Sequence, residues 1–325
     1  MKWPENIFEC YNKLTGDFPD YYHICGGGNI VNFQIENERV VAAFDSKGAE
    51  IISFKDKTTN IEYIWQADPV FWASHAPILF PFIGQSKNKQ YEYSGKAYPM
   101  TNHGFAREYD FEVSEQSKDS ISFILTDSEA TQKVYPFHFF FEITYKVENA
   151  SLVVSFQVKN TDTQKPLYYS LGAHPAFNVP MVEGTTFEDY SLSFSPKKKR
   201  KIFKLADLKD FLLDFSATTE APTDQDLPLQ YGLFKDGLFA YETAGATTCT
   251  IHSTKTSHSV AIEYDNMPYL CVWSPTPKNA PFVCIEPWVG LPDNTNATGQ
   301  LNEKFAIQKL EALTSSKTGF TITIK

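Results

Sequence analysis

Alternation between apolar and polar residues recurs along most of this chain and constrains its fold more than any other feature. From Asn29 onward the alternating segments are 31–44, 109–113, 121–125, 139–147, 152–158, 190–194, 248–252, 259–264, 282–285 and 320–324. A period of two residues is typical of strands that bury one face. Helical patterning is confined to short pieces near residues 205–213. We therefore expect an all-β fold, a large antiparallel β-sandwich, instead of a parallel α/β fold.

The pattern of residues 1–28 differs from that of the rest of the chain. These residues show neither alternation nor helical period and end in three consecutive glycines. We interpret them as a flexible N-terminal leader. Residues 29–325 show no composition break and no repeat of fixed period, so we expect a single β-sandwich domain there.

Charge and cysteine usage exclude several classes of partner. The 325 residues carry 29 Lys and Arg against 39 Asp and Glu, a formal net charge of −10, which disfavours nucleic acid and anionic membranes. No apolar stretch reaches the roughly 18 residues that span a bilayer, and the N-terminus lacks a signal-peptide pattern. The five cysteines form no C-x-x-C pair, as in reduced cytosolic proteins. We expect a cytoplasmic monomer or homodimer.

The strongest charge run is basic and covers residues 197–201, with the sequence KKKRK. We expect a solvated loop between strands. A patch that binds an anion, such as a phosphorylated ligand, is the alternative.

Four rigid, apolar turn segments interrupt the alternation, at residues 75–84, 102–107, 172–177 and 284–290. Gly104 follows His103, and Pro175 follows His174, so the backbone fixes where each imidazole points. Glu286 follows an apolar run, where an unpaired carboxylate would be costly. Each residue alone fits an ordinary core position, but together they form the minimal acid and base set for proton transfer. Trp273 is an aromatic residue able to stack on a sugar ring.

These segments together resemble the aldose 1-epimerase, or galactose mutarotase, family. The matching pieces occur in the family's order: APILFP at residues 76–81, HGFAR at 103–107, GAHPAF at 172–177, and EPW at 286–288 followed by Gly290, Pro292 and Asp293. The run YLCVW at 269–273 is most similar to the LacX-like branch.

The resemblance implies a β-supersandwich that interconverts the α and β anomers of a free hexose. By the same resemblance, Glu286 is the general base, His174 is the general acid, and His103 and Arg107 bind the substrate. The implied partner is a monosaccharide, and neither a cofactor nor a metal is implied. The histidines also lack a ligand spacing such as H-E-x-x-H.

One position departs from the family pattern, because Gln85 stands where many members carry a substrate-binding arginine. Glutamine can still exchange hydrogen bonds with a sugar, but it lacks the charge and the fork of arginine. Asp236 aligns loosely with a position that holds ring hydroxyls. Three alternatives remain open: a non-catalytic carbohydrate-binding or sensing protein, a glycoside-cleaving enzyme, and a metal site. The first of these is the runner-up.

Overall fold

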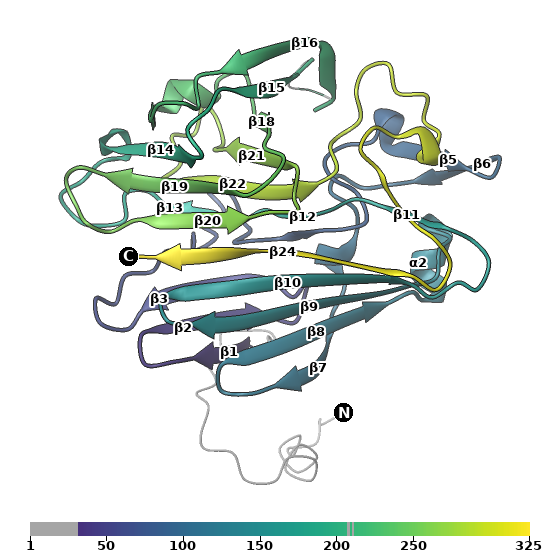
Figure 1. Cartoon of the computed structure of the whole chain (residues 1–325), viewed down its shortest axis with the longest axis horizontal. Helices are drawn as coiled ribbons and strands as arrows, with labels where there is room; N and C mark the ends of the chain where they lie inside the picture. Colours follow the sequence, from purple (N-terminus) through teal and green to yellow (C-terminus); the bar gives the residue numbers. More distant parts are fainter. Residues whose placement is uncertain (1–31, 207–208, 210) are drawn as a thin grey trace, which may run out of the picture.

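The structure, a computed structural model, describes residues 32–206, 209 and 211–325 (Figure 1). The leader expected over residues 1–28 lies outside them. The expected all-β fold is confirmed, and the strands of the two large sheets pair antiparallel. Among the described residues, no helix has the length and apolarity that crossing a bilayer requires.

One large sheet has nine strands, with β24 at its centre (Figure 1). β24 pairs with β10 on one side and with β20 on the other, so it joins two groups of strands. In spatial order the strands are β17 (Leu227–Pro228), β14 (Tyr190–Ser195), β19 (Thr247–Ser253), β20 (Val260–Tyr264), β24 (Ser315–Ile324), β10 (Ser151–Asn160), β9 (Phe139–Glu148), β8 (Ser120–Thr126) and β7 (Glu112–Gln116).

The other large sheet has eight strands and carries the candidate site. In order they are β16 (Leu213–Ala221), β15 (Arg200–Leu205), β18 (Phe239–Glu242), β21 (Tyr269–Trp273), β22 (Phe282–Val289), β12 (Leu171–Ala173) and β4 (Ile78–Leu79), and β13 (Ala176–Asn178) also pairs with β22.

Smaller elements complete the fold. The short sheets are β1 (Asn32–Glu36), β2 (Val40–Asp45) and β3 (Ile51–Asp56); β5 (Gln90–Tyr93) and β6 (Lys96–Pro99); and β11 (Leu167–Tyr169) and β23 (Gln308–Leu310). The helices are α2 (Glu129–Val134) and the 3-10 turns η1 (Lys87–Lys89), η2 (Ala106–Glu108), η3 (Phe187–Asp189), η4 (Tyr231–Phe234) and η5 (Leu301–Glu303).

Strand β22 is buried along its whole length because both of its faces are covered. Val283 and Ile285 point into the main apolar core, which also contains Phe141 and Ile322 of the nine-stranded sheet. Since successive side chains of a strand alternate between faces, Cys284, Glu286 and Trp288 point the opposite way. Cys284 and Trp288 belong to two separate apolar clusters on that second face. The site therefore lies on the face of the sheet that points away from the main core.

Several local expectations need correction. Segment 31–44 contains two strands, β1 and β2, and the strand expected at 109–113 is β7, which begins three residues later. The helical pieces expected near residues 205–213 are wrong for the described residues there: β15 ends at Leu205 and β16 begins at Leu213. Residues 207, 208 and 210 lie outside the description.

The solvated loop expected for residues 197–201 is only partly correct. The lysines are exposed, but Arg200 is buried in β15. Its guanidinium donates to the carbonyl oxygens of Pro196 (3.0 Å) and Lys198 (3.2 Å) and to Oγ1 of Thr223 (3.2 Å). It also lies 4.9 Å from the centre of the Phe194 ring. These neutral acceptors and the ring allow the arginine to be buried with no carboxylate partner among residues 32–206, 209 and 211–325.

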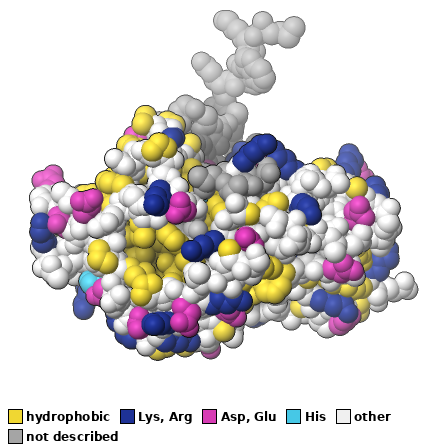
Figure 2. All heavy atoms as spheres, turned by 90° about the horizontal axis from the view of Figure 1, so that it is seen from above, with side chains coloured by type: hydrophobic (Ala, Val, Ile, Leu, Met, Phe, Trp, Pro, Cys, Tyr) yellow, Lys and Arg dark blue, Asp and Glu magenta, His cyan; other side chains and the backbone are white. Residues whose placement is uncertain are grey.

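The surface above β15 and β16 carries mixed charge. Figure 2 shows Lys and Arg side chains interspersed with Asp and Glu around a patch of apolar side chains. Among the described residues visible in Figure 2, the side chains form no continuous basic stripe of the kind that follows a phosphate backbone.

Candidate active site

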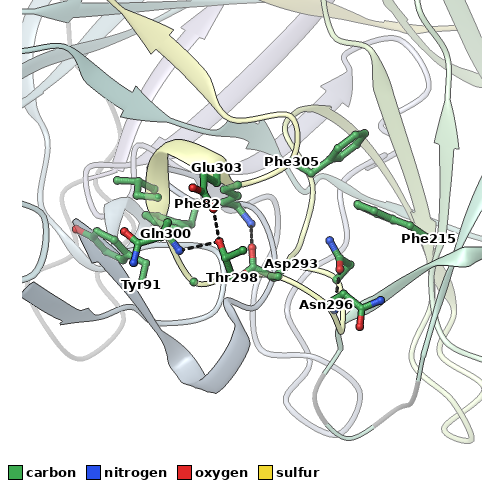
Figure 3. Close-up of a pocket in the computed structure, with 14 residues that line it drawn as sticks. Phe82, Tyr91, Phe215, Asp293, Asn296, Thr298, Gln300, Glu303 and Phe305 are labelled. Carbon is green, nitrogen blue, oxygen red and sulfur yellow. Dashed lines mark hydrogen bonds and ion pairs between the residues drawn. The ribbon is translucent and has the colours of Figure 1, made fainter. Parts of the chain in front are cut away.

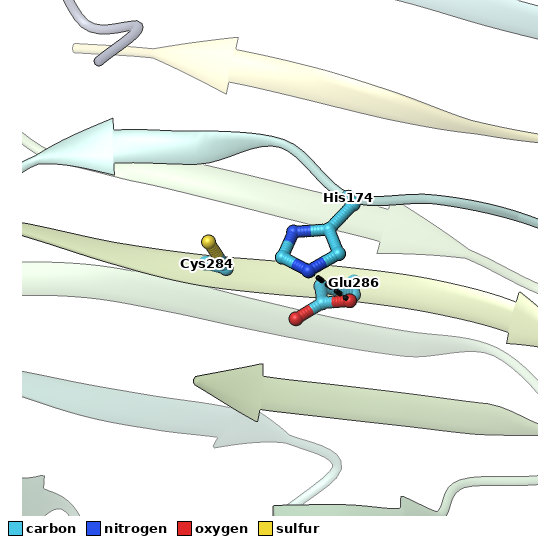
Figure 4. A group of neighbouring side chains, drawn as sticks. All are labelled: His174, Cys284 and Glu286. Atoms are coloured by element: carbon cyan, nitrogen blue, oxygen red, sulfur yellow. Dashed lines mark ion pairs between the residues drawn. The ribbon is translucent and has the colours of Figure 1, made fainter. Parts of the chain in front are cut away.

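The two residues expected to exchange protons lie side by side although 112 positions separate them in the chain. Glu286 is on β22, and His174 is in the turn between β12 and β13, where its backbone N–H donates to the Pro77 carbonyl at 2.9 Å. Nε2 of His174 is 3.3 Å from Oε2 of Glu286 (Figure 4). The structure therefore brings the predicted acid and the predicted base within reach of one proton.

The carboxylate of Glu286 is buried and unsatisfied. The residue is 1% exposed, and neither carboxylate oxygen has a hydrogen-bond partner among the described residues. Burial raises the pKa of this carboxyl well above its usual value. The nearby Cys271 thiol and Trp288 indole oppose that rise without reaching hydrogen-bond geometry. Such a group is costly to bury unless a ligand supplies the missing hydrogen bonds.

His174 is enclosed by aromatic rings. Its ring stacks on Trp72 at 4.9 Å between centroids, and Trp273 meets it edge-on at 5.6 Å. Burial lowers the pKa of His174 to about 3, and the charge of Arg107 acts in the same direction. Nδ1 of the imidazole has no partner among the described residues. At neutral pH these surroundings favour a neutral imidazole.

His103 is held in a fixed tautomer beside this pair. Its backbone is left-handed, with φ of 66°, and the following Gly104 is also left-handed, where an added Cβ would lie 2.3 Å from the Phe80 carbonyl oxygen. The backbone N–H of Gly84 donates to Nδ1 of His103 at 3.1 Å. Because Nδ1 accepts, the ring proton sits on Nε2, which becomes a donor. The rings of His103 and His174 are 5.5 Å apart.

The pKa of His103 lies well below its usual value. Burial is the main cause, followed by the neighbouring His174 and Arg107. The tautomer and the low pKa together make His103 a neutral hydrogen-bond donor at physiological pH.

Arg107 and Gln85 flank the histidines. Arg107 belongs to η2, its side chain is 32% exposed, and its charge influences both imidazoles. The half-buried Gln85 donates from Nε2 to the Ser86 carbonyl at 3.3 Å. Gln85 also lines a groove of about 600 Å³ that runs past Asn102, the neighbour of His103.

Trp273 contacts the acid–base pair, whereas Asp236 has no described contact with it. Trp273 is half-buried against His174. Asp236 is exposed on the turn between η4 and β18, and no described hydrogen bond or ion pair links it to the acid–base pair. Pairing of Phe239 with Val272 places that turn near the end of β21 that carries Trp273.

Three neighbours of the pair escaped sequence reasoning. Trp72 lies in a segment without alternation, and its position shortly before the 75–84 motif was the only available signal. Cys284 lies two positions before Glu286, which for a strand means the same face. Cys271 pairs with Glu286 across β21 and β22, a register that the sequence does not specify.

A separate cavity of about 210 Å³ lies among residues 291–305 and strand β5, away from the pair (Figure 3). The buried ion pair between Lys304 and Asp293, 2.5 Å long, forms part of its wall. Thr298 and Gln300 lie at the same wall and bond to Glu303 and Glu92. These polar groups of the wall therefore already have protein partners.

Comparisons with known proteins agree on one family. The family model described as aldose 1-epimerase matches residues 32–302. The plasmid-encoded protein LacX of Lactococcus lactis subsp. lactis is 33% identical over 305 residues, which cover 90% of this chain and 99% of LacX.

Two solved structures are also similar. A galactose mutarotase related enzyme from Lactobacillus acidophilus has a TM-score of 0.88 at 38% identity, covering 91% of this chain and 97% of that one. A galactose mutarotase-like protein from Lactobacillus casei has a TM-score of 0.83 at 34% identity, covering 91% of this chain and 100% of that one.

Proposed function

This chain belongs to the aldose 1-epimerase family, and on that premise we propose that it interconverts the α and β anomers of a free hexose of the galactose or glucose type. The observation that carries the proposal is the carboxylate of Glu286, which is buried without a hydrogen-bond partner in the part of the chain that the structure describes and lies 3.3 Å from an imidazole nitrogen. A donor that a ligand brings, such as the hydroxyl on C1 of a sugar, fits this unsatisfied acceptor.

The proposed reaction needs a base and an acid on one substrate. Glu286 removes the proton from the C1 hydroxyl while His174 protonates the ring oxygen, and the C1–O5 bond breaks to give the open-chain aldehyde. Rotation about the C1–C2 bond presents the other face of the carbonyl. Return of both protons closes the ring as the opposite anomer, so the enzyme is unchanged and no covalent intermediate forms.

The pair needs one proton for this chemistry. Before a sugar binds, this proton is bound mainly to Glu286, because burial raises the pKa of Glu286 and lowers that of His174. Transfer across the 3.3 Å contact gives carboxylate and imidazolium, the form that the reaction uses. Sugar hydroxyls that donate to Glu286 stabilise this form, since hydrogen bonds to a carboxylate favour its charged state.

Neighbouring residues take supporting roles in the proposal. The Nε2–H of His103 donates to a sugar oxygen, and the Trp273 ring packs on an apolar face of the pyranose. Gln85 and Arg107 contact outer hydroxyls, and Asp236 reaches the sugar from the end of the sheet. Gln85, lacking the charge of arginine, makes a weaker and less directional contact than the arginine common in the family.

The test follows the anomeric NMR signals of freshly dissolved α-glucose, α-galactose and hexose 6-phosphates, with and without protein. We expect acceleration above the spontaneous rate for at least one sugar. Glu286→Gln should lower kcat by about 10² to 10⁴-fold, the usual share of one general acid or base. Glu263→Gln, the same change at an exposed strand position, is the matched control.

Two outcomes discriminate between the functions. Full turnover in folded Glu286→Gln rules out the base assignment. Binding of a sugar with no acceleration favours the non-catalytic carbohydrate-binding alternative. Action in the cytoplasm is also part of the proposal, and it is supported by the free thiols of Cys249, Cys271 and Cys284.

A further inference from the structure

The acid–base pair is part of a larger cluster of metal-ligating side chains. His174, Cys284 and Glu286 each offer one ligating atom, and these atoms all lie within 4.8 Å of one another (Figure 4). All three residues are buried. The alternation of β22 directs Cys284 and Glu286 to the same face, and the turn before β13 brings His174 over them.

Three polar atoms of this cluster lack a hydrogen-bond partner among the described residues. Both carboxylate oxygens of Glu286 and Nδ1 of His174 are buried without a hydrogen bond among the described residues. A second thiol, that of Cys271, pairs across the sheet with Glu286 and lies close enough to influence it. Buried polar atoms in this state are rare and need an explanation, such as an ion or a ligand.

We propose that His174, Cys284 and Glu286 bind a thiophilic divalent cation, Zn²⁺ above all. One nitrogen, one sulfur and one carboxylate oxygen suit Zn²⁺ and its analogue Co²⁺, whereas Mg²⁺ and Ca²⁺ prefer oxygen ligands alone. Three protein ligands leave a fourth tetrahedral position for water. Binding releases the thiol proton of Cys284 and the carboxyl proton of Glu286, while His174 binds as the neutral imidazole. No electron transfer is involved.

Metal binding has a consequence for turnover, and this part rests on the proposed function. A cation held by His174 and Glu286 would engage the two residues that are proposed to move protons to and from the sugar. Zn²⁺ should therefore inhibit anomer interconversion, and a chelator should restore it.

The experiment uses Co²⁺ as the probe, in a chain that carries Cys10→Ser and Cys25→Ser so that thiols outside the described residues do not respond. Titration should produce the near-ultraviolet thiolate-to-cobalt band and the visible bands of tetrahedral Co²⁺, saturating at about one equivalent, and Zn²⁺ should displace them. The bands should disappear in Cys284→Ser. They should persist in Cys249→Ser, which removes a buried thiol on β19.

Absence of a saturable thiolate band, or the same band in Cys284→Ser, overturns the proposal. Glu286→Gln is a second ligand variant and should weaken Co²⁺ affinity by at least roughly tenfold, with circular dichroism verifying the fold of each protein. The cobalt spectrum does not depend on activity. A protein that binds Co²⁺ but fails to act on sugars contradicts the proposed function alone, and an active protein without the band contradicts the metal site alone.

Discussion

A carboxyl group as deeply buried as that of Glu286 resists ionisation, since the charged form loses its water and gains no hydrogen bond in return. Its raised pKa means that the folded chain holds this proton at pH values where the unfolded chain has released it. Folding stability contributed by this group is therefore fully present at low pH and falls as pH rises through the raised pKa. The residue proposed as the base thus costs stability at neutral pH.

The first prediction tests this cost. Glu286→Gln should increase the free energy of unfolding at pH 7.5 by on the order of 1 kcal/mol, because the amide keeps the shape without the ionisation penalty. The gain should vanish below about pH 4, where the carboxyl is protonated in both states. Urea unfolding at the two pH values measures it, with Glu263→Gln as the exposed control. A variant less stable than wild type at pH 7.5 would contradict this view of the site.

The second prediction concerns the pH dependence of the rate. The reactive pair keeps one proton between the low pKa of His174, about 3, and the raised pKa of Glu286. We expect kcat/KM, corrected for the spontaneous reaction, to stay nearly constant around pH 6.5, where an ordinary histidine titrates. The rate should fall in acid when the pair takes a second proton, and in alkali when it loses its only one. An acid limb centred near pH 6.5 would refute this.

Among the elements, the segment 66–74 packs against the pair through Trp72. It has no strand pairing, and its Trp72 lies flat on His174 while Val70 is exposed. The bonds that hold the segment include those from Trp65 Nε1 to the Trp72 carbonyl and from Lys278 Nζ to the Phe71 carbonyl, both 2.9 Å. The Trp72 ring therefore contributes to the burial of the His174 imidazole.

The third prediction is that Trp72→Ala exposes His174 to water. Its pKa should rise from about 3 toward its usual 6.5, because desolvation is the main cause of the depression. The acid limb of kcat/KM should therefore move to higher pH. The control is Phe71→Ala, which removes a ring that packs on Trp65. If the acid limb of Trp72→Ala coincides with that of wild type, Trp72 does not shield the imidazole.

Strands with one buried face could be predicted from the sequence more readily than strands buried on both faces, although part of the fully buried β22 was predicted at residues 282–285. β9 alternates between buried and less buried residues and lies where predicted. β12 is buried at all three positions, and β21 at four of five, so neither shows a period of two. Tertiary packing alone distinguishes such strands from other short apolar runs. Arg200 escaped prediction for a related reason, since its acceptors at Pro196, Lys198 and Thr223 form only once β15 is in place.

At the scale of the whole molecule, the sequence predicts only those candidate site residues that lie within its recognisable motifs. The sequence indicated His103, His174 and Glu286 as candidate site residues because Gly104, Pro175 and Pro287 lie directly beside them. The depth of burial, the stacking of Trp72 and the neighbouring thiols depend on how β21, β22 and segment 66–74 pack. No local pattern encodes that packing.

The fourth prediction tests how tightly the two groups of strands are joined by β24. A Cβ at Gly319 would lie 2.2 Å from the carbonyl oxygen of Val154 on β10, so the backbones of the two strands would have to separate. Gly319→Ala should therefore destabilise the whole fold by about 1–3 kcal/mol. Gly232→Ala, at an open position, should be neutral or stabilising. Equal unfolding midpoints in urea for the two variants would contradict the prediction, because they would mean that β10 and β24 accommodate the added methyl group without loss of stability.

The central position of β24 also affects how the chain is made. The edge of β10 that does not pair with β9 can pair with β24 only after roughly 150 further residues have been synthesised. At about 5–20 residues per second of synthesis, this leaves an apolar edge strand unpaired for roughly 10–30 s on the ribosome. Unpaired edges are templates for pairing with other chains. Nascent copies of this protein should therefore depend on chaperones during translation more than a sheet built from successive hairpins would.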